Sequence, residues 1–303
     1  MVKSTLPYCY SSGASADRIE PKRATPSTDL KHVCGDDSSL RNSLFMPTVD
    51  DQSKLAVVTG AAKPGYGCAI TRRLLTDGFA IHGTFEAEDA DSAQSLQREF
   101  GTARLHLEQC DHGNPTALTA FATNLHAGIQ ALVNAQFFFN MESPTAFDHA
   151  LWNRSLAVNL SAPNLLVHEL SAKLASDSSI VTITSTEGFI GSFGASAYAA
   201  SKAAIHNLTK TFANNLGSRG IRANVVAAGW IGGVMDTDEV FNMSRRITPL
   251  GRLGLPEEIA AVVSFLLSKD ASFVNGSVIT ADGGYSGVDT IAKYEFEQFV
   301  KSL

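Results

Sequence analysis

The chain has 303 residues and is 44% hydrophobic, so it can form one large α/β domain or two small ones with a sizeable core. Its net charge of −6 argues against a nucleic-acid-binding surface, and no apolar run approaches the roughly 18 residues of a membrane helix. Cysteines without paired spacing favour free thiols in a reducing compartment, so we expect a cytoplasmic protein without a metal site. The four cysteines are Cys9, Cys34, Cys68 and Cys110.

Residues 1–53 are rich in Ser, Thr, Pro, Asp and Lys, and they show neither helical nor strand periodicity. This composition predicts a flexible extension ahead of a single domain that spans 54–303. The extension lacks the apolar stretch of a secretory signal, and its acidic residues disfavour an organellar transit peptide. A regulatory or partner-binding role for the extension stays open as the alternative.

A buried strand at 54–59 is followed by a glycine-rich turn and then by a helix that begins near residue 68. Glycines let the backbone approach a pyrophosphate, and the free N–H groups of the helix N-terminus point towards it. This strand, turn and helix order is the context that a dinucleotide-binding motif requires. We therefore expect a dinucleotide to contact Gly60, Lys63, Gly65, Tyr66 and Gly67.

The second strand, 80–85, ends at an acidic segment that begins with Glu86. An acid at this point can bind the ribose 2′-hydroxyl of NAD and repel the 2′-phosphate of NADP, so NAD(H) is favoured over NADP(H). In the alternative, these acids begin the next helix, where its dipole stabilises them. Lys63 in the glycine turn offsets part of their charge if it meets a phosphate.

Short apolar strands and amphipathic helices continue to alternate through the rest of the chain. This alternation predicts an α/β fold with a doubly wound, Rossmann-like parallel sheet and ligands at the carboxyl ends of its strands. The further strands are expected at 103–107, 129–134, 179–185, 221–227 and 276–281. Helices are expected at 92–100, from 114, from Ser143 through Leu170, at 197–216 and from Pro256 to Leu267.

Tyr198 and Lys202 are four residues apart in the helix expected at 197–216, so they share one helix face. A cation beside a phenol favours the phenolate, which predicts a lowered pKa for Tyr198 and proton transfer near neutral pH. Ser185 ends the strand at 179–185, where its hydroxyl can hold a substrate oxygen near the phenol. Taken alone, the tyrosine and lysine spacing is weak evidence and is more typical of a solvated helix face.

Over about residues 54–290 the chain resembles the short-chain dehydrogenase/reductase family. The matching motifs occur in the family's order: Thr59-Gly60 with Gly65 and Gly67, Asp111, Asn159, Ser185, Tyr198-x-x-x-Lys202, Pro249 through Pro256-Glu-Glu-Ile-Ala260, and Asp282-Gly-Gly284. The resemblance implies hydride transfer between nicotinamide and a carbonyl or alcohol carbon, with the hydride chemistry supplied by the cofactor.

The resemblance also implies a role for each matching side chain. Tyr198 is the catalytic acid or base, Lys202 lowers its pKa and holds the nicotinamide ribose, and Ser185 positions the carbonyl oxygen. Asn159 supports a water relay to Lys202, and Asp111 contacts the adenine. Three further residues fall at positions expected near the cofactor, namely Asn134, Gly229 and Ile231.

The chain departs from the family pattern around the cofactor. Four residues, rather than the usual three, separate Gly60 from Gly65, which is typical of the enoyl-carrier-protein reductase branch. That branch spaces its tyrosine and lysine more widely than this chain does. Asn-Ala-Gln-Phe at 134–137 replaces Asn-Asn-Ala-Gly, Ala228 replaces a proline, and Gly233 replaces a threonine. The catalytic set is thus complete while the cofactor-binding loops are altered.

Pro163 follows Asn159 by four residues, and proline has no N–H to bond the Asn159 carbonyl in a continuous helix. We therefore expect a kink that leaves this carbonyl free for a relay water. A new helix that begins at Pro163 is the alternative.

Apolar segments flank the active tyrosine, which predicts a largely hydrophobic pocket for a small-molecule ketone or secondary alcohol. The substrate contacts expected are Glu187, Phe189, Phe193 and Trp230, with a wall from Phe137-Phe138-Phe139 and a lid at about 232–250. A carbon–carbon double-bond (enoyl) reductase and a nucleotide-binding regulatory protein with little turnover are the two alternatives. The family resemblance alone implies a homotetramer or homodimer.

Overall fold

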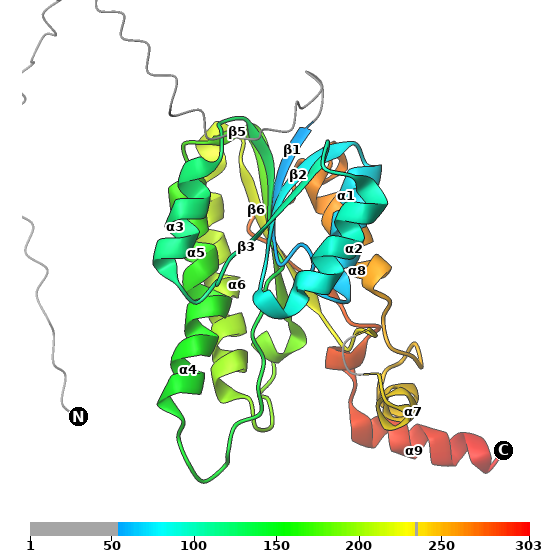
Figure 1. The fold of residues 1–303 in the computed structure, drawn as a ribbon. Coiled ribbons are helices and arrows are strands. Elements are labelled where there is room, and N and C mark those ends of the chain that lie inside the picture. The colour runs from blue at the N-terminus through cyan, green and yellow to red at the C-terminus, as the bar shows by residue number, and fades with distance from the viewer. Residues whose placement is uncertain (1–53, 234–235) are drawn as a thin grey trace, which may run out of the picture. The chain divides into compact units, whose positions relative to one another are not determined.

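The computed structural model describes residues 54–233 and 236–303, so the prediction of a flexible extension at 1–53 lies outside the described residues. Seven strands form one parallel sheet in the order β3-β2-β1-β4-β5-β6-β7 (Figure 1). The order reverses between β1 and β4, which is where ligands bind to doubly wound sheets. The strands are β1 (Lys54–Thr59), β2 (Phe79–Phe85), β3 (Leu105–Gln109), β4 (Ile129–Asn134), β5 (Leu174–Ser185), β6 (Arg222–Ala228) and β7 (Val278–Ala281).

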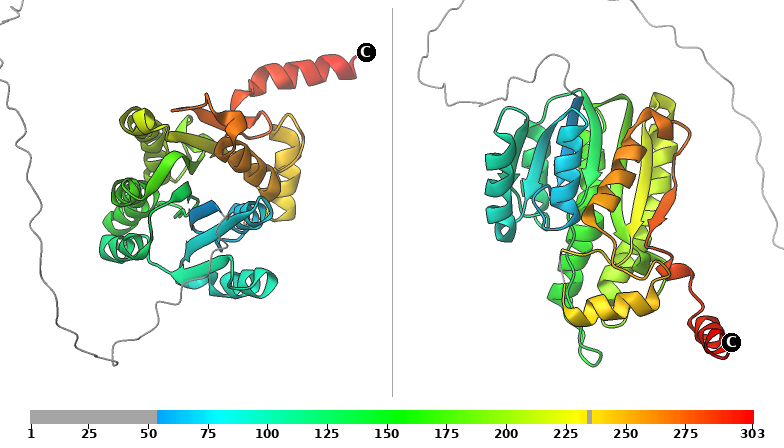
Figure 2. Two further views of the ribbon diagram at one scale, coloured as in Figure 1. Left: turned by 90° about the horizontal axis from the view of Figure 1, so that it is seen from above. Right: turned by 90° about the vertical axis from the view of Figure 1, so that its right-hand side faces the viewer.

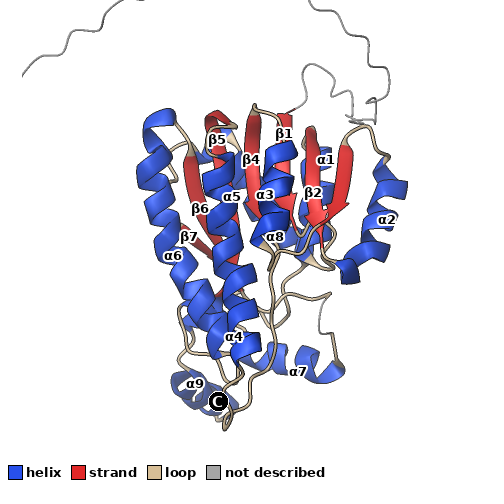
Figure 3. Ribbon diagram, turned by 60° about the vertical axis from the view of Figure 1, so that its left-hand side comes forward, coloured by secondary structure: helices blue, strands red, loops and turns tan. Residues whose placement is uncertain are grey.

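Helices cover both faces of the sheet, which confirms the predicted doubly wound fold (Figure 3). One face is covered by α1 (Tyr66–Thr76), α2 (Ala90–Phe100) and α8 (Pro256–Leu267). The other is covered by α3 (Pro115–Asn124), α4 (His149–Leu156), α5 (Ala162–Leu170) and α6 (Ser196–Leu216).

Each face of the sheet has its own apolar core, because successive strand residues point to opposite sides. In β1, Ala56 and Val58 pack under α1 and α8, whereas Val57 packs under α3 and α5. All three side chains are fully buried, as expected for a parallel strand covered by helices on both sides. This rigid layer fixes the carboxyl ends of the strands, where the motif residues lie.

The largest differences from the predicted element boundaries occur at one helix and one strand. The helical region after β4 begins at His149 and not near Ser143, because the Asp148 carboxylate accepts hydrogen bonds from the N–H groups of Ala150 and Leu151 at 2.9 and 3.0 Å. Strand β5 begins five residues before the predicted residue 179, at Leu174.

The predicted lid region contains a helix, α7 (Asp238–Ile247), which Thr237 caps through its side chain. Residues 234 and 235 of this region lie outside the described residues. The lid function itself stays a prediction.

The last helix, α9 (Thr290–Lys301), extends away from the sheet in both views of Figure 2. It has no buried residue, and its apolar side chains are exposed. Among the helices of the described ranges, we find none with the length and apolarity needed to cross a bilayer.

Candidate active site

The turn between β1 and α1 has a backbone that only glycine can adopt without strain or collision. Gly60 and Gly65 have φ angles of 64° and 83°. A Cβ at Gly60 would lie 2.8 Å from the Gln136 backbone, and one at Gly67 would lie 2.3 Å from the Gly60 carbonyl oxygen. No side chain caps the N-terminus of α1. The turn therefore fits a cofactor pyrophosphate, which would take the place of a capping side chain.

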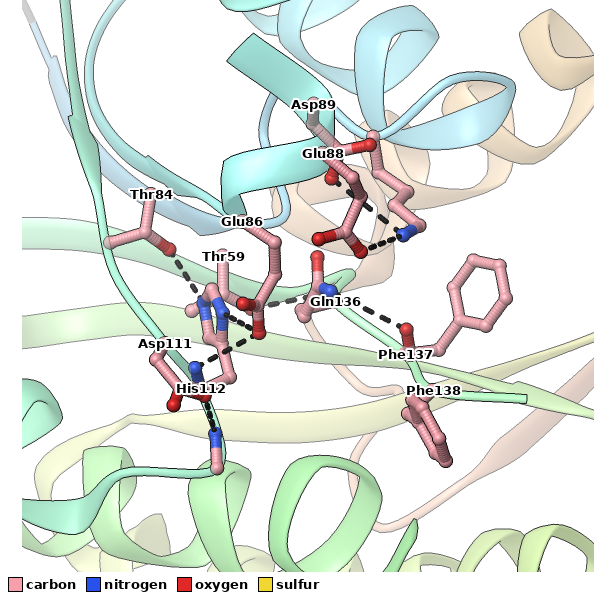
Figure 4. Close-up of polar contacts among 12 residues, drawn as sticks. Thr59, Thr84, Glu86, Glu88, Asp89, Asp111, His112, Gln136, Phe137 and Phe138 are labelled. Atoms are coloured by element: carbon pink, nitrogen blue, oxygen red, sulfur yellow. Dashed lines mark hydrogen bonds and ion pairs between the residues drawn. The ribbon is translucent and has the colours of Figure 1, made fainter. Parts of the chain in front are cut away.

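Lys63, the basic residue of this turn, is already surrounded by acidic and aromatic groups. Its ammonium lies 3.3 Å from a Glu88 carboxylate oxygen and 3.7 Å from one of Asp89 (Figure 4). It also lies 5.5 Å from the ring centroid of Phe137, whose ring packs against Tyr66. The acids reduce the positive charge that Lys63 presents to a phosphate.

The altered sequence after β4 narrows the space above the glycine turn. The Gln136 side-chain oxygen lies 2.7 Å from where a Gly60 Cβ would be, and it is buried with no hydrogen-bond partner among the described residues. Asn134 donates to the Thr182 hydroxyl at 3.2 Å, while its own side-chain oxygen also has no such partner. Two acceptors in this segment are thus buried without a donor among the described residues, which is uncommon in a folded protein.

Glu86, expected at the cofactor ribose, lies in a buried network (Figure 4). Its carboxylate accepts a hydrogen bond from the backbone N–H of His112 at 3.0 Å. The carboxylate also lies 3.2 Å from Nδ1 of the His112 imidazole and 3.2 Å from a guanidinium nitrogen of Arg154. With Nδ1 donating, His112 Nε2 accepts from the Thr84 hydroxyl at 2.8 Å. Burial raises the Glu86 pKa, but the hydrogen bonds from His112 and the Arg154 charge outweigh it, so the pKa is lowered.

Arg154 connects this network to Asp111, the residue expected at the adenine. Asp111 bonds the guanidinium of Arg154 and accepts from the Gly113 N–H at 2.8 Å. The Arg154 hydrogen bond is the main cause of a lowered Asp111 pKa. The roles of Glu86 and Asp111 towards a cofactor stay predictions.

The structure brings Ser185, Tyr198 and Lys202 together where β5 ends beside α6. The Ser185 hydroxyl lies close enough to the Tyr198 phenol to influence its pKa, and the Lys202 ammonium lies 5.3 Å from the phenol ring centroid. Lys202 is only 2% exposed and donates to the Ile183 carbonyl of β5 at 3.2 Å. One strand end and one helix face thus hold all three groups.

The pKa of Tyr198 is raised, whereas the sequence predicts a lowered value. Burial is the main cause, the Glu187 carboxylate adds to it, and the hydrogen bond from Ser185 opposes it. Burial also lowers the Lys202 pKa to about 7, so the cation that was expected to stabilise a phenolate is itself disfavoured. The prediction was wrong because it considered the charges and not their desolvation.

Asn159 lies in a π-helical turn, Ala157–Ser161, which joins α4 directly to α5. The irregular helix predicted ahead of Pro163 is therefore present, with Pro163 in the first turn of α5. The Asn159 amide donates to the Phe138 carbonyl at 2.8 Å and to Ser155 at 3.1 Å, and its oxygen accepts from the Phe138 N–H at 2.9 Å. The side chain holds the segment after β4 in place, and the water relay stays a prediction.

The expected substrate contacts differ in their exposure and in their packing. Phe189 packs on the His206 ring at 4.5 Å, Phe193 is 98% exposed, and Trp230 is half exposed. Glu187 has a buried carboxylate oxygen without a partner among the described residues. The aromatic ring that contacts Tyr198 edge-on, at 5.2 Å between centroids, is Phe139 of the expected aromatic wall.

Gly229 and Ile231 follow β6 on the same edge of the sheet. A Cβ at Gly229 would lie 2.6 Å from Asp282, so this position requires glycine for packing. Ile231 pairs with Gly254 in an isolated parallel bridge. Their contacts with a cofactor stay predictions.

Glu142 is a positioning residue that sequence reasoning missed. Its carboxylate accepts from the Ala197 N–H at 2.7 Å and bonds the Ser196 hydroxyl, so it caps the first turn of α6. Burial raises the Glu142 pKa, but these bonds outweigh it and the pKa is lowered. The position of Tyr198, one turn into the helix, depends on this cap.

Comparisons with known proteins agree with this geometry. Residues 60–286 match the family model described as "Enoyl-(Acyl carrier protein) reductase". The chain is 34% identical to a cis-4-hydroxycyclohexanecarboxylate dehydrogenase from Sinomonas cyclohexanicum, over 78% of this chain and 97% of the relative.

Two solved structures share the fold. One is a blue fluorescent protein from a metagenomic library in complex with NADPH, with a TM-score of 0.71, 29% identity and coverage of 77% of this chain and 97% of that one. The other is a short-chain dehydrogenase/reductase from Serratia marcescens, with a TM-score of 0.71, 30% identity and coverage of 78% and 98%. The chain therefore belongs to the short-chain dehydrogenase/reductase family of NAD(P)-dependent oxidoreductases.

Proposed function

We propose that the protein interconverts a ketone and a secondary alcohol on a largely apolar small molecule. The observation that carries this proposal is the Ser185 hydroxyl close to the Tyr198 phenol, with the Lys202 ammonium beside the phenol ring. A hydroxyl and a phenol side by side can hold and protonate one carbonyl oxygen. Neither the enoyl reductase nor the low-turnover alternative gains support from the geometry of the site.

Bound NAD(P)(H) would supply or accept the hydride. The glycine turn and the α1 N-terminus would hold its pyrophosphate, and Asn134 would offer an acceptor to its donors. Ser185 orients the substrate oxygen, and Tyr198 gives it a proton in reduction or takes one in oxidation. A raised phenol pKa keeps Tyr198 protonated at neutral pH, which suits reduction.

We propose NAD(H) as the preferred cofactor. The segment after β2 places Glu88 and Asp89 beside one basic residue of the turn, Lys63, and a third acid, Glu86, begins the same segment. This excess of acid disfavours the additional phosphate of NADP(H). The NADPH in the related metagenomic protein makes a direct comparison of the two cofactors necessary.

The test is cofactor oxidation with NADH and NADPH separately, against aliphatic, aromatic and cyclic ketones. A cyclohexanone carboxylate belongs in the panel, because the relative from Sinomonas oxidises a hydroxycyclohexanecarboxylate by its name. Matched enones are the control for carbon–carbon reduction. We expect ketone turnover that is faster with NADH. Turnover of enones alone, or cofactor binding without turnover of any panel member, would contradict the proposal.

We also propose a cytoplasmic homo-oligomer in which α9 contributes to self-association. The free thiols Cys68 and Cys110 fit a reducing compartment. Phe296 and Phe299 of α9 are 65% and 58% exposed, which suits an apolar contact with a second copy. Sedimentation of the full chain should show a dimer or tetramer, and Phe296→Glu should weaken it. A monomeric wild type would contradict this proposal.

A further inference from the structure

Three side chains with metal-ligating atoms meet on the edge strands of the sheet, away from the catalytic group. Residue 82 of β2 lies opposite residue 106 of β3, and Glu108 follows two residues later on the same face of β3. The imidazoles of His82 and His106 and the Glu108 carboxylate place one ligand atom each within 4.8 Å of the others. No other cluster of this kind exists in the described ranges 54–233 and 236–303.

The alternation of β3 explains why the cluster forms. Leu105 and Leu107 point into the core beneath α1 and α2, so His106 and Glu108 point to the opposite face. There the His82 ring meets the His106 ring edge-on, at 4.5 Å between centroids, and Phe121 of α3 covers it at 5.5 Å. The face beneath α3 thus holds polar groups at positions where an apolar core would be expected.

The polar groups of the cluster are incompletely satisfied. His82 Nε2 and Glu108 Oε1 lie 3.2 Å apart, which makes an ion pair only when the ring is protonated, and neither buried atom has any other partner among the described residues. Buried polar atoms are nearly always bonded, so a pair of unbonded ones calls for a shared ligand. A cation between the two atoms would satisfy both.

We propose that His82, His106 and Glu108 bind a zinc ion that ties the edge strand β3 to β2. Two imidazoles and one carboxylate are a common zinc donor set, and bonds near 2.0–2.1 Å place tetrahedral ligands roughly 3.3 Å apart. The spacing between His82 and Glu108 already matches this value. Side-chain exposures of 23% for His82 and 35% for Glu108 give the ion a path from solvent and leave room for a water as fourth ligand.

The site is independent of the oxidoreductase chemistry, because none of its three residues belongs to the catalytic group or the glycine turn. The sequence prediction of no metal site rested on cysteine spacing and did not consider histidines brought together by strand pairing.

The test is zinc binding by the untagged full chain, first stripped with a chelator. We expect zinc at about 100 times its Kd to raise the melting temperature by roughly 5 °C or more, and excess chelator to reverse the rise. Cobalt(II), as a spectroscopic probe, should give the visible absorption of a nitrogen and oxygen site. Hydrogen exchange of the β3 amides should slow when zinc is present.

His106→Gln and Glu108→Gln should each weaken zinc binding by more than the roughly 10- to 100-fold that loss of an outer-shell contact costs. His126→Gln is the control, because His126 is exposed and lies outside the cluster. The metal-free melting temperature of each variant shows that it folds. Absence of a zinc-induced shift in the wild type, or an undiminished shift in both cluster variants, would overturn the proposal.

Discussion

The catalytic group and the glycine turn lie at the carboxyl ends of neighbouring strands, but different kinds of contact hold them. Ser185, Tyr198 and Lys202 are fixed by one strand end and one helix, and Lys202 is buried against the backbone of β5. Around the glycine turn, Lys63 meets Glu88, and Glu86 meets Arg154, in a set of side-chain pairs. Backbone contacts hold the side chains of the first region in place, whereas the side chains around the glycine turn are held by charge pairs with one another.

This difference explains where the chain tolerates changes from its family. A phenol displaced by 1 Å from a substrate oxygen loses its function, so the backbone contacts around Tyr198 leave little freedom. A nucleotide is held by many contacts, and loss of one lowers affinity without abolishing binding. We therefore expect Gln136 and Phe137, in place of alanine and glycine, to change cofactor affinity and to leave the chemistry unchanged.

The largest expected effect comes from the phenol. Tyr198→Phe should lower turnover by about 10²- to 10⁴-fold, because the substrate oxygen loses its proton donor. The Kd of the cofactor, measured by fluorescence titration, should change little. Tyr294→Phe is the control, since Tyr294 is 63% exposed on α9. If the loss of cofactor affinity were large enough to explain the loss of turnover, the catalytic group and the cofactor site would not be independent of each other.

The next effect concerns the buried lysine. Lys202→Met should abolish most turnover yet raise the free energy of unfolding by roughly 2–4 kcal/mol at pH 7, because a pKa of about 7 means that the folded state disfavours the ammonium. Between pH 7 and 10 the unfolded wild type binds the proton that the folded protein has lost. Wild-type stability should therefore rise with pH in this window, by about 2 kcal/mol between pH 7 and 9.

Urea unfolding at pH 7 and 9 measures this slope. Lys202→Met should lack it, while Lys210→Met should keep it, since Lys210 is exposed on the same helix. Equal slopes in wild type and Lys202→Met would show that the ammonium is not destabilised by burial.

A smaller effect is expected at the altered loop. The double change Gln136→Ala with Phe137→Gly restores the small residues typical of the family and opens the space above Gly60. We expect the Kd of NADH to fall by about tenfold, equivalent to about 1.4 kcal/mol, with kcat unchanged. Phe273→Ala is the control, because that ring is fully exposed. Weaker binding would show that the larger side chains hold the cofactor and do not hinder it.

The smallest effect is expected at the charge network. Arg154→Met should lower the free energy of unfolding by about 1–2 kcal/mol near neutral pH, because Glu86 loses one of its partners while His112 still bonds it. The Glu86 pKa is lowered in the folded state, so its contribution is present above about pH 4.3 and is lost as the pH falls further.

Urea unfolding at pH 7 and 3 should therefore show that the difference between wild type and Arg154→Met shrinks in acid. Arg98→Met, on the exposed face of α2, serves as the control. A difference that is independent of pH would mean that Arg154 stabilises the fold by packing alone.

The sequence alone was enough to predict the elements whose sequence patterns lie within a few neighbouring residues. Alternating strands and helices predicted the sheet, and the four-residue spacing of Tyr198 and Lys202 placed both on one helix face. The glycine turn was predictable because its conformational requirement falls on adjacent residues. The predicted start of a helix was wrong where several residues in the sequence can act as an N-cap. The helix α4 is capped by Asp148 and does not begin near Ser143.

The contacts that sequence reasoning missed join residues far apart in the chain. Arg154 reaches Glu86 across 68 positions, and Glu142 reaches Ala197 across 55. No periodicity or spacing rule relates such pairs, because the packing of the whole sheet brings them together. The predicted direction of the Tyr198 pKa shift was wrong for a related reason, because burial is a property of the folded protein and not of two neighbouring residues.

The burial of Lys202 has a consequence for chemical labelling. Amine-selective reagents modify exposed lysines quickly, and a side chain that is 2% exposed reacts only when the surrounding structure opens. Once exposed, its ammonium loses a proton as readily as that of any other lysine. The labelling rate of Lys202 therefore depends only on how often the surrounding structure opens. Modification of Lys202, followed by mass spectrometry with Lys210 as the internal fast reference, would time the opening of the catalytic region.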